Sequence, residues 1–153
     1  MRIGLAADHA GAAMKDELLE RLADAGHELL DLGGDGSDTD DDYPDFAVRI
    51  GHAVRDGLVD RGILVCGSGV GASVAASKIV GVRAAVCHDT YSARQGVEHD
   101  DLNVLCLGGR VVGIELADAC ARAFLGAHFS GEPRHVRRLG KILAIEAEES
   151  GRA

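Results

Sequence analysis

Short apolar runs alternate with amphipathic stretches along the chain, and this alternation is the feature that most limits its fold. Strands are expected over residues 2–7, 27–32, 62–66, 82–87 and 103–107. Helices are expected over residues 11–25, 44–55, 68–78, 90–96, 114–128 and 134–149. Strands separated by helices pair in parallel, and strands that are apolar throughout are covered on both faces. The pattern predicts a doubly wound, Rossmann-like three-layer α/β/α sandwich with a five-stranded, mainly parallel sheet, as a single domain spanning residues 1–153.

Composition narrows the classes of partner. The chain has 153 residues, 46% of them apolar, and its 16 basic and 25 acidic side chains give a formal charge of −9. Nucleic acid is therefore not expected as a partner, although a small phosphorylated ligand needs only a few cations. No apolar run approaches the roughly 20 residues of a membrane helix, and an acidic residue at position 8 does not fit a signal peptide. We expect a soluble, cytoplasmic protein with no membrane partner.

The cysteines and the acidic segment carry weaker signals. The four cysteines are widely spaced without a C-x-x-C pair, so neither a zinc site, a redox pair nor a disulfide framework is expected. Cys87, Cys106 and Cys120 follow or occupy apolar runs and are interpreted as packing residues. The segment 34–42, GDGSDTDDD, lacks EF-hand spacing and is interpreted as a solvated, mobile loop.

Polar residues follow four of the five expected strands. They are Asp8-His9, Cys66-Gly67-Ser68-Gly69, His88-Asp89 and Gly108-Gly109-Arg110. Ligands of open α/β sheets bind outside the carboxyl ends of the strands, so we expect these residues to form one site.

The stretch from Gly67 to Gly71 is rich in glycine and lies between a strand and a helix. Its unobstructed amides and the helix N-terminus favour an anion, although a turn chosen for close helix–strand packing would also explain the glycines. A dinucleotide loop fits poorly, because that motif follows the first strand and needs an acidic residue after the second. The absence of G-K-[ST] excludes a Walker loop.

Cys66 immediately precedes this loop and is the candidate reactive group. A thiol at the start of a helix ionises readily and acts as nucleophile or as general base. A base beside an anion-binding loop suits removal of a proton next to a carbonyl, with the enediolate stabilised by the loop amides. His99, among carboxylates, is a candidate acid or base.

Arg134 and Arg138 are spaced four apart, on one face of the last expected helix. Two guanidinium groups in this arrangement can bind a phosphate, although a solvated basic face would show the same spacing.

Nearly the whole chain resembles the type B ribose-5-phosphate isomerases and the related galactose-6-phosphate isomerase subunits. The resemblance rests on several motifs that occur in order. They are Asp8-His9-Ala10-Gly11, Asp42-Tyr43-Pro44-Asp45, Gly62–Gly71, His99-Asp100-Asp101-x-Asn103, Gly109-Arg110-Val111-Val112-Gly113 and Arg134-His135-x-x-Arg138.

The resemblance implies an isomerase of the pentose phosphate pathway, without metal or cofactor, that interconverts ribose 5-phosphate and ribulose 5-phosphate through an enediolate. It assigns Cys66 as the base between C1 and C2 and His99 as the acid/base that opens the sugar ring. Asp8 and Ser68 assist proton movements. The implied substrate-binding residues are His9, Gly67, Gly69, Val70, Gly71, Asp100, Arg110, Arg134 and Arg138. The implied site lies between two subunits of a homodimer or homotetramer.

Departures from the family pattern keep further functions open. Asp100 stands where members commonly have Asn, and a carboxylate there repels an enediolate unless it is protonated or turned away. Ser68 replaces the commoner Thr and keeps its hydroxyl. The substrate could instead be a tetrose, hexose or deoxy-sugar phosphate. A non-catalytic sugar-phosphate-binding subunit of a heteromeric isomerase is a second function that stays open. A third, a nucleotide-binding domain, is disfavoured.

Overall fold

A five-stranded parallel sheet forms the centre of the computed structural model, which describes residues 1–151. The strands are β1 (Arg2–Ala7), β2 (Glu28–Asp31), β3 (Arg61–Cys66), β4 (Ala84–Val86) and β5 (Val104–Gly108). Their order is β2-β1-β3-β5-β4, and every neighbouring pair is parallel. The predicted parallel sheet is confirmed.

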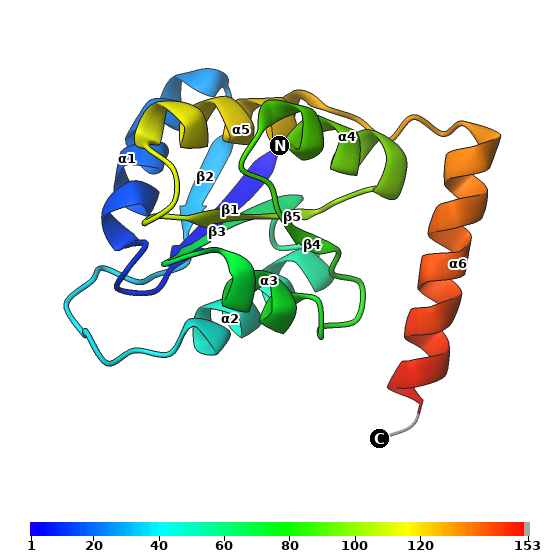
Figure 1. Ribbon diagram of the computed structural model, residues 1–153, viewed down its shortest axis with the longest axis horizontal. Coiled ribbons are helices and arrows are strands. Elements are labelled where there is room, and N and C mark those ends of the chain that lie inside the picture. The colour runs from blue at the N-terminus through cyan, green and yellow to red at the C-terminus, as the bar shows by residue number, and fades with distance from the viewer. Residues whose placement is uncertain (152–153) are drawn as a thin grey trace.

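Helices cover both faces of this sheet (Figure 1). They are α1 (Ala12–Leu22), α2 (Tyr43–Arg55), α3 (Val70–Ala76), α4 (Thr90–Asp100), α5 (Ile114–Gly126) and α6 (Pro133–Ser150), with a short 3-10 turn η1 (Ala23–Ala25). One face packs against α1, α4 and α5 and the other against α2 and α3. The three-layer α/β/α fold is therefore confirmed.

The two apolar cores follow from the alternation of side chains along each strand. On one face, Leu18 of α1 and Phe124 of α5 join a buried cluster with Leu105 of β5. On the other, Ile50 of α2 joins a cluster with Cys106, the next residue of β5. A central strand buried on both faces has no polar side to present, which explains the long apolar runs of β1, β3 and β5.

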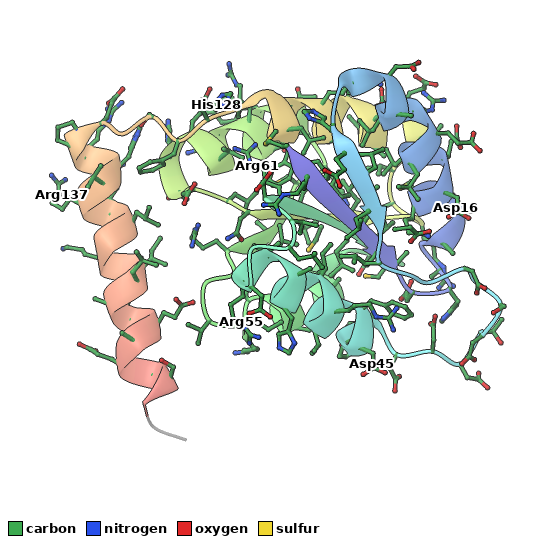
Figure 2. All side chains as sticks on the ribbon, turned by 180° about the vertical axis from the view of Figure 1, so that it is seen from behind. Asp16, Asp45, Arg55, Arg61, His128 and Arg137 are labelled. Atoms are coloured by element: carbon green, nitrogen blue, oxygen red, sulfur yellow. The ribbon has the colours of Figure 1, made fainter. Side chains whose placement is uncertain are left out.

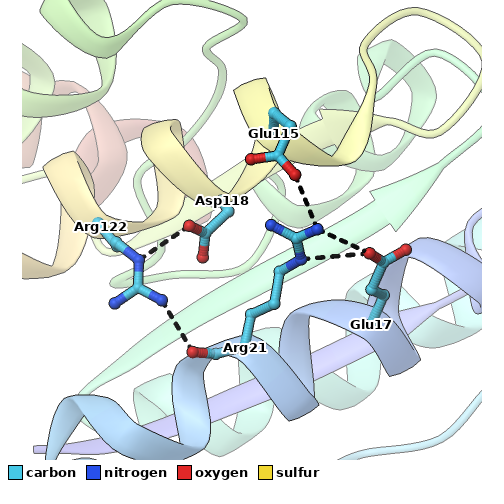
Figure 3. Close-up of polar contacts among 5 residues, drawn as sticks. All are labelled: Glu17, Arg21, Glu115, Asp118 and Arg122. Atoms are coloured by element: carbon cyan, nitrogen blue, oxygen red, sulfur yellow. Dashed lines mark hydrogen bonds and ion pairs between the residues drawn. The ribbon is translucent and has the colours of Figure 1, made fainter.

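Helices α1 and α5 lie side by side and are linked by charged side chains (Figure 3). Arg21 donates to Glu17 of its own helix and to Glu115 of α5, at 3.0 and 2.9 Å. Arg122 of α5 donates to Asp118 and to the carbonyl of Arg21, at 2.9 and 2.8 Å. These exposed contacts add little stability individually.

A half-buried arginine binds the carbonyl end of α5. Arg61, at the start of β3 and labelled in Figure 2, donates to the carbonyl oxygens of Phe124 and Ala127. The last carbonyls of a helix lack partners within it, so this guanidinium satisfies two of them. It thereby sets where the chain leaves α5 toward α6.

Helix α6 stands beside the sandwich, at the far side of the molecule from α1 (Figures 1 and 2). It packs against α4 and, with β4 and α4, lines a groove of about 850 Å³. Its apolar side chains Val136, Ile142, Leu143 and Ile145 are 40% to 62% exposed. We call these four side chains the apolar stripe of α6; exposed apolar residues gathered on one helix are typical of an interaction surface.

Several expected boundaries were wrong. Helix α4 continues past Gly96 to Asp100, and the side chain of Leu102 packs over Gly96, 3.2 Å from where a Cβ would lie. Helix α3 starts only at Val70, because Gly69 is left-handed with φ +80°. Strand β4 covers only three residues. The expected helix end at Gly26 is confirmed by its left-handed φ of +71°.

Within residues 1–151, no helix is long and apolar enough to cross a bilayer.

Candidate active site

Backbone hydrogen bonds hold three strand ends together at the carboxyl edge of the sheet. The amide of Asp8, after β1, donates to the carbonyl of the residue preceding Cys66 over 3.2 Å. The amide of Gly109, after β5, donates to the carbonyl of Cys66 over 2.8 Å, and that of Arg110 to Gly67 over 3.0 Å. His88, which follows β4, bonds to the last residue of β5. The residues after these four strands therefore lie at one edge, as expected from the sequence.

Cys66 is buried at the end of β3, with 4% of its surface exposed. The amide of Gly69 donates to its Sγ over 3.1 Å. An amide directed at sulfur stabilises negative charge on it. In the same loop, the hydroxyl oxygen of Ser68 accepts a hydrogen bond from the amide of Val70 over 3.2 Å. The glycine-rich loop thus directs one backbone donor, the amide of Gly69, at the thiol.

The other three cysteines are of a different kind. Burial raises the pKa of Cys87 to about 11 and raises those of Cys106 and Cys120 as well. All four are free thiols that belong to the apolar cores, but Cys66 differs in accepting the amide of Gly69 at its sulfur. The interpretation of Cys87, Cys106 and Cys120 as packing residues is supported.

Asp8 is 6% exposed, and its Oδ1 accepts from the amide of Gly11 over 3.0 Å. Burial raises the pKa of this carboxyl, and the bond from Gly11 opposes part of the rise. A carboxyl group with a raised pKa at a ligand-binding edge is suited to exchange protons with a substrate.

His9 is held by a residue that the sequence predicts only as part of a solvated loop. Asp41 Oδ1 lies 2.5 Å from His9 Nδ1 and accepts the amide of His9 over 3.0 Å. This hydrogen bond raises the pKa of His9, so the imidazole favours its cationic form. The side chain of Asp41 is only 13% exposed, so its part of segment 34–42 packs on the site rather than lying free in solvent.

Glycines allow close approach elsewhere at this edge. A Cβ on Gly67 would lie 3.9 Å from Nη1 of Arg110, so that guanidinium lies beside the loop. A Cβ on Gly71 would lie 2.6 Å from the ring of Tyr43, so the position of this ring requires glycine at residue 71. Tyr43 was identified only as a motif residue, and its position over the loop was not predicted.

His99 and Asp100 lie in the last turn of α4. The expectation that His99 follows a short helix was wrong, because α4 runs on to Asp100. The ring of His99 stacks on His135 of α6, with centroids 3.9 Å apart, and its Nδ1 lies 2.7 Å from Nε2 of Gln95. Asp100 lines the groove beside α6.

Arg134 and Arg138 are exposed on the first turns of α6. Arg134 pairs with Glu132 over 2.9 Å. Between them His135 is 1% exposed, and burial next to His99 lowers its pKa. Its Nδ1 lies 2.6 Å from Ser130 Oγ, so this histidine anchors α6 to the loop before it.

The candidate residues fall into two groups at opposite ends of β5. Cys66 pairs with Gly108, the last residue of that strand. Helix α4 runs back from the carboxyl edge, so His99 in its last turn lies near the start of the strand. A strand of five residues spans roughly 15 Å. We call Asp8, His9, Cys66, the 67–71 loop and Arg110 the sheet-edge group, and His99, Asp100, Arg134 and Arg138 the α4–α6 group.

Together the two groups contain a thiol that accepts a backbone amide, titratable acids and bases, and several cations. These are the parts required to bind a phosphorylated ligand and move a proton within it. Within residues 1–151, no cluster of three or more His, Cys, Asp or Glu side chains is arranged to hold a metal ion.

Known proteins resemble this chain over nearly its whole length. Ribose-5-phosphate isomerase B of Escherichia coli is 46% identical over 95% of this chain and 96% of its own. A D-erythrulose-4-phosphate isomerase of Pectobacterium atrosepticum is 40% identical over 86% of each chain.

Solved structures agree with these relatives. The ribose-5-phosphate isomerase B of Clostridium thermocellum superimposes with a TM-score of 0.91 at 45% identity, over 97% of this chain and 99% of that one. The Mycoplasma genitalium enzyme with bound ribulose 5-phosphate gives 0.90 at 40% identity, over 96% and 97%. Residues 3–142 match the model of the family described as Ribose/Galactose Isomerase. The chain therefore belongs to the ribose/galactose isomerase family.

Proposed function

We propose that this protein is an aldose–ketose isomerase that interconverts ribose 5-phosphate and ribulose 5-phosphate, acting as one domain over residues 1–153. The observation that carries the proposal is Cys66, a buried thiol whose Sγ accepts a hydrogen bond from the amide of Gly69 in the glycine-rich loop. Membership of the family and relatives named as isomerases of ribose 5-phosphate support it.

In the proposed reaction, the Cys66 thiolate removes the proton from C2 of the open-chain aldose. The C–H electron pair forms the C1–C2 double bond, and the carbonyl oxygen O1 gains a proton. Cys66 then returns its proton to C1 while the hydroxyl on O2 loses one, which leaves the ketose. The amides of the 67–71 loop stabilise the negative charge that develops on the enediolate oxygens.

The remaining side chains handle hydroxyl protons and the phosphate. Asp8, whose pKa is raised by burial, moves protons between the oxygens with the help of Ser68. His99 opens the furanose ring by transferring a proton from the C1 hydroxyl to the ring oxygen. The cations His9, Arg110, Arg134 and Arg138 bind the phosphate and the sugar hydroxyls, as charge-assisted donors do.

We further propose that two copies of the chain share each site. One chain separates the sheet-edge group from the α4–α6 group by about the length of β5. The exposed apolar stripe of α6 and the groove beside it offer a surface on which a second copy packs. A homodimer then brings His99, Asp100, Arg134 and Arg138 of one copy to Cys66 of the other. The free thiols support a reducing, cytoplasmic location.

Ribose 5-phosphate in D₂O with EDTA, followed by NMR, tests the activity. The expected result is that ribulose 5-phosphate forms and carries deuterium at the carbon that receives the transferred proton. Cys66→Ser is expected to abolish both conversion and exchange while phosphate-ligand binding persists. Cys120→Ala, which removes a packing thiol from α5, is the matched control and is expected to keep activity. Full activity of Cys66→Ser contradicts the assignment of the base.

A tetrose phosphate is the second candidate substrate. Two relatives, at 40% and 36% identity, are named D-erythrulose-4-phosphate isomerases. Asp100 belongs to the α4–α6 group, and we expect it to influence whether tetrose, pentose or hexose phosphates are preferred. A panel of tetrose, pentose and hexose phosphates, compared by kcat/KM, distinguishes them. A protein that binds these ligands but converts none fits the non-catalytic subunit instead.

A further inference from the structure

A side chain replaces a backbone partner at the end of β5. Strand β4 ends at Val86, and the last backbone contact between the two strands joins the amide of Cys87 to Cys106 over a long 3.4 Å. The chain then turns into α4, whose N-cap is Asp89. The buried amide of Gly108 is therefore left without a strand beside it, and it donates to Nε2 of His88 over 2.9 Å. A buried amide needs such an acceptor.

Gly108 directly supports the loop that carries Cys66. A Cβ on Gly108 would lie 2.7 Å from the carbonyl carbon and oxygen of Ser68. On the loop side, a Cβ on Gly69 would lie 3.0 Å from the carbonyl carbon of Leu107. The end of β5 and the loop are thus in backbone-to-backbone contact, so a movement of one displaces the other.

The same turn also holds the loop by hydrogen bonds. The two residues after Gly108 donate their amides to the carbonyls of Cys66 and Gly67. The second of them is Arg110, whose side chain extends beside Gly67. His88 consequently fixes one end of a short segment that is bonded directly to the proposed catalytic loop.

We propose that His88 is a positioning residue for the isomerase reaction: its Nε2 fixes the amide of Gly108 and thereby the loop amides that stabilise the enediolate. The inference rests on the proposed function. His88 acts through Gly108 and not on the substrate. Because the Gly108 amide donates, Nε2 carries no proton in this arrangement, and the ring hydrogen lies on Nδ1.

Two variants of similar length separate the acceptor from the bulk of the ring. His88→Gln retains an oxygen acceptor near the position of Nε2, whereas His88→Met fills similar space with only a weak sulfur acceptor. His52→Met, at an exposed histidine of α2, controls for the loss of a histidine in general. Each variant is assayed for kcat and KM with ribose 5-phosphate, and hydrogen exchange at the Gly108 amide is measured by NMR.

His88→Met is expected to lower kcat by roughly five- to fiftyfold with a smaller change in KM, because one buried amide loses its acceptor while the phosphate cations stay in place. Exchange at Gly108 is expected to accelerate in the same variant. His88→Gln is expected to restore kcat to within about threefold of the parent protein and to slow the exchange again. His52→Met is expected to behave as the parent.

Equal kcat in the Met and Gln variants overturns the proposal, whether both are active or both inactive. So does a loss in the Met variant that appears in KM alone. Failure of the proposed function gives a different pattern, in which the unmodified protein isomerises no sugar phosphate. Exchange at Gly108 still reports the bond to His88 in that case, and unchanged exchange in His88→Met overturns the inference by itself.

Discussion

The sheet-edge group and the α4–α6 group are built in different ways. Around Cys66, the backbone of three strand ends is joined by hydrogen bonds of 2.8 to 3.2 Å, and the thiol and Asp8 are buried. On α4 and α6, by contrast, the arginines are exposed on a helix that stands beside the sandwich. The sheet-edge group is preorganised within one chain, whereas in the proposed dimer the α4–α6 group acquires its surroundings against a second copy.

The largest effect is expected when each group is disabled in a separate variant and the two variants are then mixed. Cys66→Ser and His99→Ala are each expected to lower kcat by about 10² to 10⁴, the usual contribution of a positioned acid or base. Refolded together in equal amounts, they are expected to recover about one quarter of the parent activity, because half of the dimers are mixed and each has one intact site.

The control for this recombination uses two variants of the sheet-edge group. Cys66→Ser mixed with Asp8→Asn leaves every site with one defect, so activity is expected to stay low. Recovery in that mixture, or none in the first, contradicts a shared site.

Removing a cation from the α4–α6 group is expected to act on binding. Arg138→Ala deletes the charge-assisted hydrogen bond that we propose to the phosphate, an expected loss of about 1.5–3 kcal/mol. KM is expected to rise by roughly ten- to a hundredfold with kcat little changed, as measured by steady-state kinetics. Arg137→Ala, one position away on the same helix, is the matched control. A fall in kcat alone would assign Arg138 to the chemical step instead.

A smaller effect is expected at the contact between His9 and Asp41. Asp41 raises the pKa of His9, so the imidazole holds its charge below that pKa and loses it as the pH rises through it. Asp8 also favours the charged form, and Arg110 opposes it. Asp41→Asn is expected to shift the alkaline rise in KM to lower pH, with a severalfold effect within about pH 6 to 8.

Asp40→Asn, on the same loop, is the control for Asp41→Asn and is expected to leave the pH profile unchanged. Superimposed profiles for the parent protein and Asp41→Asn would show that Asp41 does not set the charge of His9.

The smallest effect is expected far from both groups. Arg21→Met removes the contacts with Glu17 and Glu115 that link α1 to α5 (Figure 3). Exposed ion pairs contribute little, so the Tm is expected to fall by no more than about 2 °C with kcat unchanged. A drop in activity at constant Tm would tie this helix pair to the site.

The sequence predicted the fold and the sheet-edge group better than the details of the edge strand and its helix. Apolar runs that alternate with amphipathic ones encode a covered parallel sheet directly, and strand ends meet at one edge by topology. The predicted α4 was too short because a glycine such as Gly96 often marks a helix end. Here Gly96 lies inside the helix, where it packs against Leu102. Asp41 was missed because one acidic residue among several in a loop carries no signal of which one folds back.

The amino-acid sequence by itself determined the layered α/β fold, the glycine-rich loop after β3 and the identity of the groups that carry charge and protons, because these follow from local pattern and residue chemistry. Tertiary structure alone decided that Asp41 holds His9, that His88 supplies the partner of Gly108, and that His99 lies about a strand length from Cys66 in one chain. Each of these depends on how segments distant in sequence pack at the end of a strand. There the backbone hydrogen bonds between strands stop, and side chains must bond to the backbone N–H and C=O groups that remain unpaired.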